Sequence, residues 1–220
     1  MNNIKSVADD ELLSADIGLT DYLKSLLTEK RLNKFEEILK YRTRHLAIVL
    51  ENLVEEHNAN AVMRTCECFG IQDVYVVSDH KNFKPARRVL QGSHKWLTLH
   101  KYDINKDSNT LNCINDLKQK GYKIAVTAMH TEAIPIEKVS IEKPLAVFFG
   151  RESTGATDLL LNNADMHITI PMQGFTSSFN ISVSAGIIIN QLVNRIRTSG
   201  VDWSLTDAEK NLVRFNWIKN

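Results

Sequence analysis

This sequence contains few cysteines and few prolines, and its net charge is close to zero. Its 220 residues include three cysteines and four prolines, and the formal net charge is only +1. Without an excess of either sign, no overall attraction to a nucleic acid or an anionic membrane is predicted. The composition, 43% hydrophobic and 24% charged, is typical of a globular protein. The length allows one well-buried core with appendages.

Long apolar segments and metal-ligand patterns are also missing. No run of 18 apolar residues occurs, and the first residues, MNNIKSVADDELLS, lack the apolar core of a signal peptide. Cys66 and Cys68 are one residue apart, which is not the spacing of a zinc-ligand pair, and no second pair follows. An odd number of cysteines in this context favours reduced thiols. We therefore expect a cytoplasmic protein without a metal site.

Strands and helices alternate along most of the chain. Buried strands are predicted over residues 45–50, 74–77, 123–127, 146–149 and 167–170, and helices over residues 58–69, 111–120, 156–161 and 181–196. A weak strand-like alternation occurs over residues 96–99, and residues 133–143 are predicted as a loop. This alternation predicts an α/β fold with a mostly parallel sheet and helices on both faces. Helical spacing in residues 1–44 and 200–220 predicts a helical extension at each end of the chain. In the second extension, Thr206 and Glu209 match a capping box.

Two predicted strands end in loops rich in glycine and serine, and each loop leads into a helix. Ligands of parallel sheets bind at the carboxyl ends of strands, so we expect the functional site there. The segment from Gly150 to Gly155 has the glycine spacing of a phosphate loop, but Ala156 stands where a nucleotide triphosphatase needs lysine. The glycines therefore expose backbone amides to another ligand, or they only permit a tight turn.

Local positive charge gathers in residues 81–101, although the whole chain is nearly neutral. No acidic residue occurs there, and the basic ones are Lys81, Lys84, Arg87, Arg88, Lys95 and Lys101. Such a patch suits a phosphate backbone, and a solvated face is the alternative. The candidates for contacting a phosphate backbone are Lys84, Arg87, Arg88 and Lys95.

Polar residues also cluster near the start of two predicted helices. Asn58 and Arg64 are less than two helical turns apart, so their side chains lie on different faces of an ideal helix. An N-cap role for Asn58 and a surface position for Arg64 are the simpler interpretation. Ser178 and Asn180 precede the apolar helix over residues 181–196. There they cap the helix or hold a small polar molecule.

Three motifs together resemble the SPOUT superfamily of RNA methyltransferases, specifically its TrmH-like ribose 2′-O-methyltransferases. The motifs are Asn58-Ala-Asn-Ala-Val-Met-Arg64, Phe149-Gly-Arg-Glu152-Ser-Thr-Gly155, and the stretch from Ile170-Pro-Met172 through Ser178-Phe-Asn180. The resemblance covers residues 46–197, with the motifs in order and at compatible spacing. Residues 84–96 and the terminal helices also resemble the subfamily that methylates a D-loop guanosine of tRNA.

The resemblance implies a fold, a cofactor, an assembly and a set of site residues. The fold is a SPOUT domain over residues 45–199 with a deep trefoil knot at about residues 145–199, between extensions over 1–44 and 200–220. S-adenosyl-L-methionine is the implied cofactor, and two subunits of a homodimer form the active site. The implied catalytic and site-organising residues are Asn58, Arg64, Glu152, Ser178 and Asn180. The implied cofactor-binding residues are Thr127, Gly150, Ile170, Met172 and Phe179.

The implied reaction is methyl transfer to a ribose 2′-hydroxyl, with a D-loop guanosine of tRNA as the first expectation. A ribosomal RNA nucleotide and a non-catalytic RNA-binding module are the alternatives. Guanidinium has a pKa above about 12, which makes a neutral Arg64 costly at pH 7. We therefore expect Arg64 to stabilise the developing alkoxide, with the proton passing to water or phosphate.

Overall fold

The computed structural model describes residues 22–53, 55–78, 92–102, 109–129, 132–151 and 154–220. These residues belong to two compact units, one spanning Thr43–Trp203 and one drawn from Met1–Arg42 with Ser204–Asn220. Among the described helices, none is both long and apolar enough to cross a membrane. The boundaries at residues 44 and 199 that the sequence suggests stay predictions.

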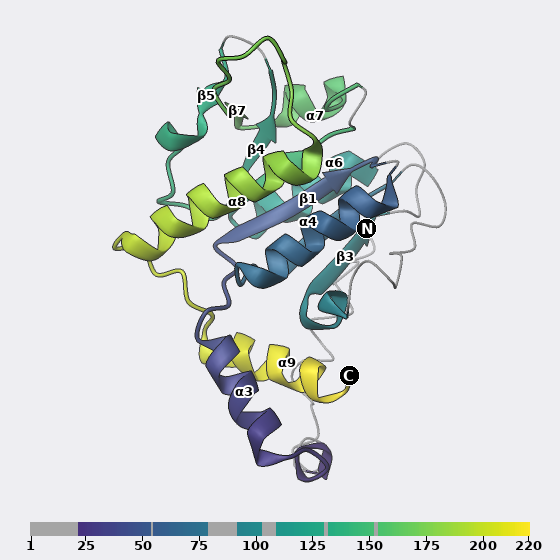
Figure 1. Cartoon of the computed structure of the whole chain (residues 1–220), viewed down its shortest axis with the longest axis vertical. Coiled ribbons are helices and arrows are strands. Elements are labelled where there is room, and N and C mark those ends of the chain that lie inside the picture. Colours follow the sequence, from purple (N-terminus) through teal and green to yellow (C-terminus); the bar gives the residue numbers. More distant parts are fainter. Residues whose placement is uncertain (1–21, 54, 79–91, 103–108, 130–131, 152–153) are drawn as a thin grey trace. The chain divides into compact units, whose positions relative to one another are not determined.

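One parallel sheet forms the centre of the larger unit. Within the described residues it has seven strands in the order β3-β2-β1-β6-β4-β7-β5 (Figure 1). The strands are β1 (Leu46–Glu51), β2 (Asp73–Val77), β3 (Thr98–Tyr102), β4 (Lys123–Thr127), β5 (Ile134–Pro135), β6 (Leu145–Phe149) and β7 (Met166–Thr169). Central β1 and β6 are buried along their whole length, which explains their continuous apolar sequences. The predicted parallel α/β fold is confirmed.

Helices cover both faces of the sheet. On one face, α4 (Glu56–Cys68) and α8 (Ile181–Thr198) lie side by side over β1, where their apolar residues pack with Leu46, Ile48 and Leu50 (Figure 1). On the other face, α6 (Asn109–Gln119) and α7 (Asp158–Asn163) pack with Ala47 and Val49. The alternation of side chains along β1 thus divides the core into two layers.

Short elements are where sequence and structure differ. Residues 133–143, predicted as a loop, contain β5 and the 3₁₀ turn η2 (Ile136–Lys138). The strand signal around residues 96–99 is displaced, since η1 (Ser93–Trp96) precedes β3. Elements of two to five residues carry too little periodicity to be located from sequence alone.

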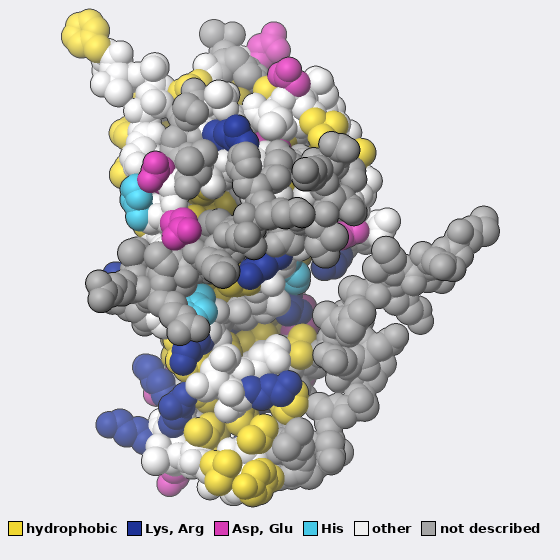
Figure 2. All heavy atoms as spheres, turned by 90° about the vertical axis from the view of Figure 1, so that its right-hand side faces the viewer, with side chains coloured by type: hydrophobic (Ala, Val, Ile, Leu, Met, Phe, Trp, Pro, Cys, Tyr) yellow, Lys and Arg dark blue, Asp and Glu magenta, His cyan; other side chains and the backbone are white. Residues whose placement is uncertain are grey.

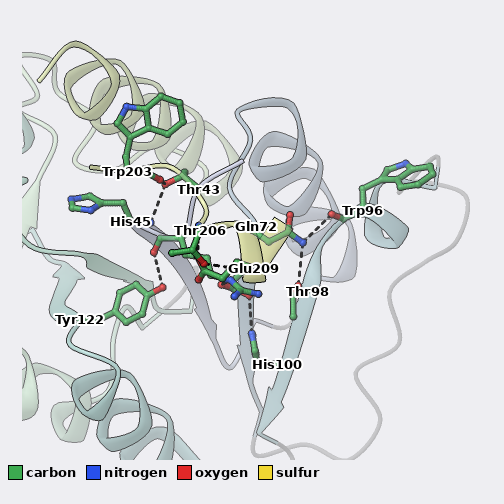
Figure 3. A network of polar contacts seen from close by, with 12 residues as sticks. Thr43, His45, Gln72, Trp96, Thr98, His100, Tyr122, Trp203, Thr206 and Glu209 are labelled. Atoms are coloured by element: carbon green, nitrogen blue, oxygen red, sulfur yellow. Dashed lines mark hydrogen bonds and ion pairs between the residues drawn. The ribbon is translucent and has the colours of Figure 1, made fainter. Parts of the chain in front are cut away.

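Polar contacts join the segments that lead into the first three strands (Figure 3). The hydroxyl of Thr43 donates to the carbonyl of Trp203 at 2.6 Å. Gln72 Nε2 donates to the carbonyl of Trp96 at 3.3 Å and to the hydroxyl of Thr98 at 3.1 Å. These bonds lie at the amino-terminal edge of the sheet, opposite the edge at which parallel sheets bind ligands.

The smaller unit pairs α3 (Glu29–Leu39) with α9 (Asp207–Ile218). The Phe35 and Trp217 rings meet edge to face, with centroids 5.6 Å apart. Arg214 donates to both carboxylate oxygens of Glu36, and this hydrogen bonding lowers the pKa of Glu36 below its ordinary value. The predicted capping box at Thr206 is present. On the face seen in Figure 2, this unit presents lysine and arginine side chains next to hydrophobic ones.

Candidate functional site

A cavity of about 470 Å³ lies at the carboxyl ends of β4, β6 and β7. Each strand contributes its last residue or the residues that follow, including Thr127, Gly150 and Ile170. Two further walls come from the loop before α8, at Met172 and Ser178, and from α8 itself. The volume is within the range of small-molecule sites, and this edge is where parallel sheets bind ligands.

The turn after β6 closes on itself at one side of the cavity. The backbone N–H groups of Arg151 and Gly155 each donate to the other residue's carbonyl at 2.9 Å. A Cβ atom on Gly150 would lie 2.3 Å from the backbone nitrogen of Ala156, so no side chain fits there. Gly155 has a φ of 73°, in the left-handed region. Both glycines are therefore needed for the tight turn, and this turn borders the cavity.

The start of α8 is joined to the start of α4 through two asparagines. Asn180 is the N-cap of α8, and its side-chain oxygen accepts from the backbone N–H of Ser182 at 2.8 Å. Its Nδ2 donates to Asn58 Oδ1 at 3.2 Å. Asn58 is buried in the first turn of α4, whose N-cap is Glu55. The simpler interpretation of Asn58 as an N-cap is therefore wrong.

Residues that the resemblance assigns to the cofactor lie around this one cavity. Thr127, Gly150, Ile170, Met172 and Phe179 all line it, although they come from three strands and a loop. Ser178 and Asn180, predicted as site-organising residues, line it as well. The structure thus brings these seven residues together, and their roles in binding and catalysis stay predictions.

Arg64 does not line this cavity in its own chain. Its side chain is exposed on α4, and it is not among the described residues that line the cavity of its own chain. Lys95 is exposed in η1, within the predicted RNA-binding stretch. The remaining predicted site residues, Glu152, Lys84, Arg87 and Arg88, lie outside the described residues.

Several lining residues were missed from the sequence. Ser184 and Ile188 follow Asn180 at intervals of four and complete the α8 wall. This spacing places all three on one helix face, and it is the sequence feature from which Ser184 and Ile188 could have been identified as lining residues. Ile168, on β7, could not be identified in this way, because its apolar character indicates only a core position. Arg151 is the one ionisable side chain among the described lining residues, so the wall favours a ligand without strong positive charge at that point.

Comparison with known proteins identifies the family. The model of the SpoU rRNA Methylase family matches residues 45–190. The chain belongs to this family. A relative from Borreliella burgdorferi, named tRNA (guanosine(18)-2'-O)-methyltransferase, is 36% identical over 211 residues, covering 96% of this chain and 93% of the relative.

Solved structures of SpoU proteins have the same fold. The Aquifex aeolicus TrmH/SpoU tRNA modifying enzyme matches with a TM-score of 0.77 and 30% identity, covering 87% of this chain and 96% of that one. The SpoU methyltransferase AviRb from Streptomyces viridochromogenes, in complex with the cofactor AdoMet, matches with a TM-score of 0.63 and 17% identity. That match covers 74% of this chain and 65% of AviRb, and it supports the fold.

Replacing Gly150 by alanine tests the tight turn of this SpoU chain. We expect Gly150→Ala to lower the free energy of unfolding by about 1–3 kcal/mol, because the new methyl group overlaps the backbone of Ala156. Gly200→Ala is the matched control, since a Cβ there meets nothing within 4 Å. Urea denaturation measures both. Equal stability of the two variants would contradict the described turn.

Proposed function

We propose that this chain is an S-adenosyl-L-methionine-dependent methyltransferase that methylates the ribose 2′-hydroxyl of guanosine 18 in tRNA. The relative that carries this name matches nearly the whole of both chains. The structural observation that carries the proposal is the cavity at the carboxyl edge of the sheet, bounded by the Gly150 turn and by Asn180. A ribosomal RNA substrate is the second candidate, because the family model is described as an rRNA methylase.

The cavity fits the chemistry of S-adenosyl-L-methionine. Ile170, Met172 and Ile188 give an apolar wall suited to an adenine ring, while the Thr127 and Ser178 hydroxyls and the backbone of the Gly150 turn supply polar groups. When bound, the cofactor supplies an electrophilic methyl group on a sulfonium. We assign Thr127, Gly150, Ile170, Met172 and Phe179 to holding it.

The residues of the chain orient the acceptor and stabilise its charge. The positive charge of the Arg64 guanidinium stabilises the oxyanion that develops on the ribose, and the proton passes to water or phosphate. Asn58 and Asn180 hold the starts of α4 and α8 together beside the cavity. We assign a site-organising role to Ser178, which lines the cavity, and to Glu152, which lies outside the described residues.

A homodimer supplies the Arg64 that a single chain lacks at its cavity. Val183 and Ile187 lie one turn apart on α8, and Phe179 lies in the loop before its N-cap. These three form an apolar stripe with exposed fractions of 48%, 36% and 45%, respectively. Neighbouring apolar side chains this exposed favour a protein interface. We propose that a second subunit covers this stripe and brings its own Arg64 to the cavity.

A trefoil knot over residues 145–199 is part of the same proposal. β6 lies between β1 and β4, whereas β7, the next strand in the chain, pairs with the other edge of β4. The chain then returns as α8 to pack on α4, over β1. The chain thus passes from β6 beyond β4 to β7 and then returns toward β1 as α8. This path supports the knot that the resemblance implies.

Methyl transfer to defined RNAs tests the proposed function. We expect the tritiated methyl group of S-adenosyl-L-methionine to appear in unmodified tRNA at guanosine 18. A tRNA with 2′-deoxyguanosine at that position is the matched control, because it lacks only the acceptor oxygen. Transfer to ribosomal RNA alone would favour the second candidate. No transfer to either RNA, with RNA binding retained, would indicate a non-catalytic binding module.

Mixing two inactive variants tests the shared site. Arg64→Ala removes the proposed charge, and Ser184→Phe fills the cavity. We expect each variant to be inactive alone, and Arg64→Lys to be inactive as well because one ammonium cannot match the planar guanidinium. Co-refolded Arg64→Ala and Ser184→Phe chains should recover roughly a quarter of wild-type turnover, since half of the dimers then contain one intact site of two. No recovery would contradict a site built from two subunits.

Salt dependence tests the basic stretch as an RNA-binding surface. We expect the double substitution of Arg87 and Arg88 by alanine to raise the Kd for tRNA and to reduce the slope of log Kd against log salt by roughly one to two. Lys138 and Lys143, which are exposed outside the stretch, give the matched double-alanine control. An unchanged slope for the arginine variant would remove this stretch from the interface.

A further inference from the structure

A fully buried carboxylate lies at the end of the central strand β1. Glu51 is 0% exposed, and its side chain points to the face covered by α6 and α7, as expected from its alternation with Ala47 and Val49. Burying a carboxylate is costly unless hydrogen bonds compensate for the lost water. No role for Glu51 follows from the cavity itself, because it is not among the described lining residues.

The hydrogen bonds of Glu51 join three separate elements. The backbone N–H of Thr157 donates to Oε2 at 3.1 Å, and the Thr157 hydroxyl donates to Oε1 at 2.7 Å. On the other side, the Thr110 hydroxyl of α6 donates to Oε1 at 3.0 Å. Both carboxylate oxygens are therefore engaged, and two of the three donors belong to Thr157.

Thr157 is the point where the Gly150 turn leaves the cavity. It directly follows Ala156, and its hydroxyl also caps α7 by accepting from the N–H of Leu160. At the other end of the turn, Phe149 pairs with Leu50 in the ladder between β6 and β1. Adjacent residues of β1, Leu50 and Glu51, thus hold the start and the exit of the same turn.

We propose that Glu51 is a positioning residue for S-adenosyl-L-methionine: it fixes the exit of the Gly150 turn in the conformation that binds the cofactor. This inference rests on the proposed function, because it assigns that cofactor to the cavity. Glu51 acts only through Thr157 and the turn. Its loss should therefore weaken cofactor binding much more than the methyl-transfer step.

The substitution Glu51→Gln keeps the shape of the side chain and replaces one acceptor oxygen by an NH₂ donor. The amide keeps the Thr157 N–H bond only with its NH₂ group toward the two threonine hydroxyls, which must then accept instead of donate. The bonds also lose the carboxylate charge that strengthens them. We expect the Kd for S-adenosyl-L-methionine to rise about tenfold by calorimetry. The KM for the cofactor should rise in parallel, with kcat at saturating cofactor within about threefold of wild type.

Two threonine variants keep the test decisive if Glu51→Gln does not fold. Thr157→Val removes the hydroxyl bond to Glu51 and should raise the Kd, whereas Thr157→Ser retains the hydroxyl and should restore wild-type binding. Asp165→Asn is the control for a structural carboxylate. Asp165 Oδ2 accepts from the backbone N–H of Ile124 at 2.8 Å, near the amino end of β4, so this variant should change stability without changing the Kd.

The outcomes separate this inference from the proposed function. Wild-type protein that binds the cofactor, together with Glu51→Gln and Thr157→Val variants that bind it equally well, would overturn the positioning role and leave the proposed function intact. A fall in kcat with an unchanged KM would also overturn it, because that result indicates only a smaller folded fraction. Wild-type protein that neither binds the cofactor nor transfers methyl groups would overturn both.

Discussion

The hydrogen bond between Asn180 and Asn58 joins two helices whose starting residues are far apart in the sequence. A neutral hydrogen bond contributes only about 1 kcal/mol net, but a buried amide left without its partner costs about 1–3 kcal/mol. Because the side-chain oxygen of Asn180 also caps α8, the same side chain fixes where that helix begins. The wall formed by Ser184 and Ile188, one and two turns further along, depends on that starting point.

The parallel sheet supplies the second constraint. Since all its described strands run in one direction, the ends of β4, β6 and β7 meet at one edge, and the chain must turn there three times. At Gly150 the turn is so tight that a side chain cannot be accommodated. The side chain of Glu51, buried on the face of the sheet that α6 and α7 cover, holds the exit of this turn. A small-molecule site at this edge is thus supported from both faces of the sheet.

Much of this arrangement could be predicted from the sequence, since buried strands have continuous apolar sequences and helix starts have capping residues. The strand at Ala146 and the cap at Asn180 are local features of this kind. The contacts of Asn58 and Glu51 could not be predicted, because each depends on a partner more than 100 residues away. Ser184 could be predicted only in part. Its spacing from Asn180 indicates a shared helix face, but no local feature of the sequence distinguishes a face that lines a cavity from one that packs in the core.

The most direct test of the central claim is a crystal structure of the full chain with S-adenosylhomocysteine. We expect a dimer with the ligand between the Gly150 turn and the Ser184 face of α8. We also expect the partner subunit's Arg64 at the opening of the cavity, and a knotted chain over residues 145–199. Ligand bound elsewhere, an unknotted chain, or Arg64 directed into solvent away from the cavity in every subunit would contradict it.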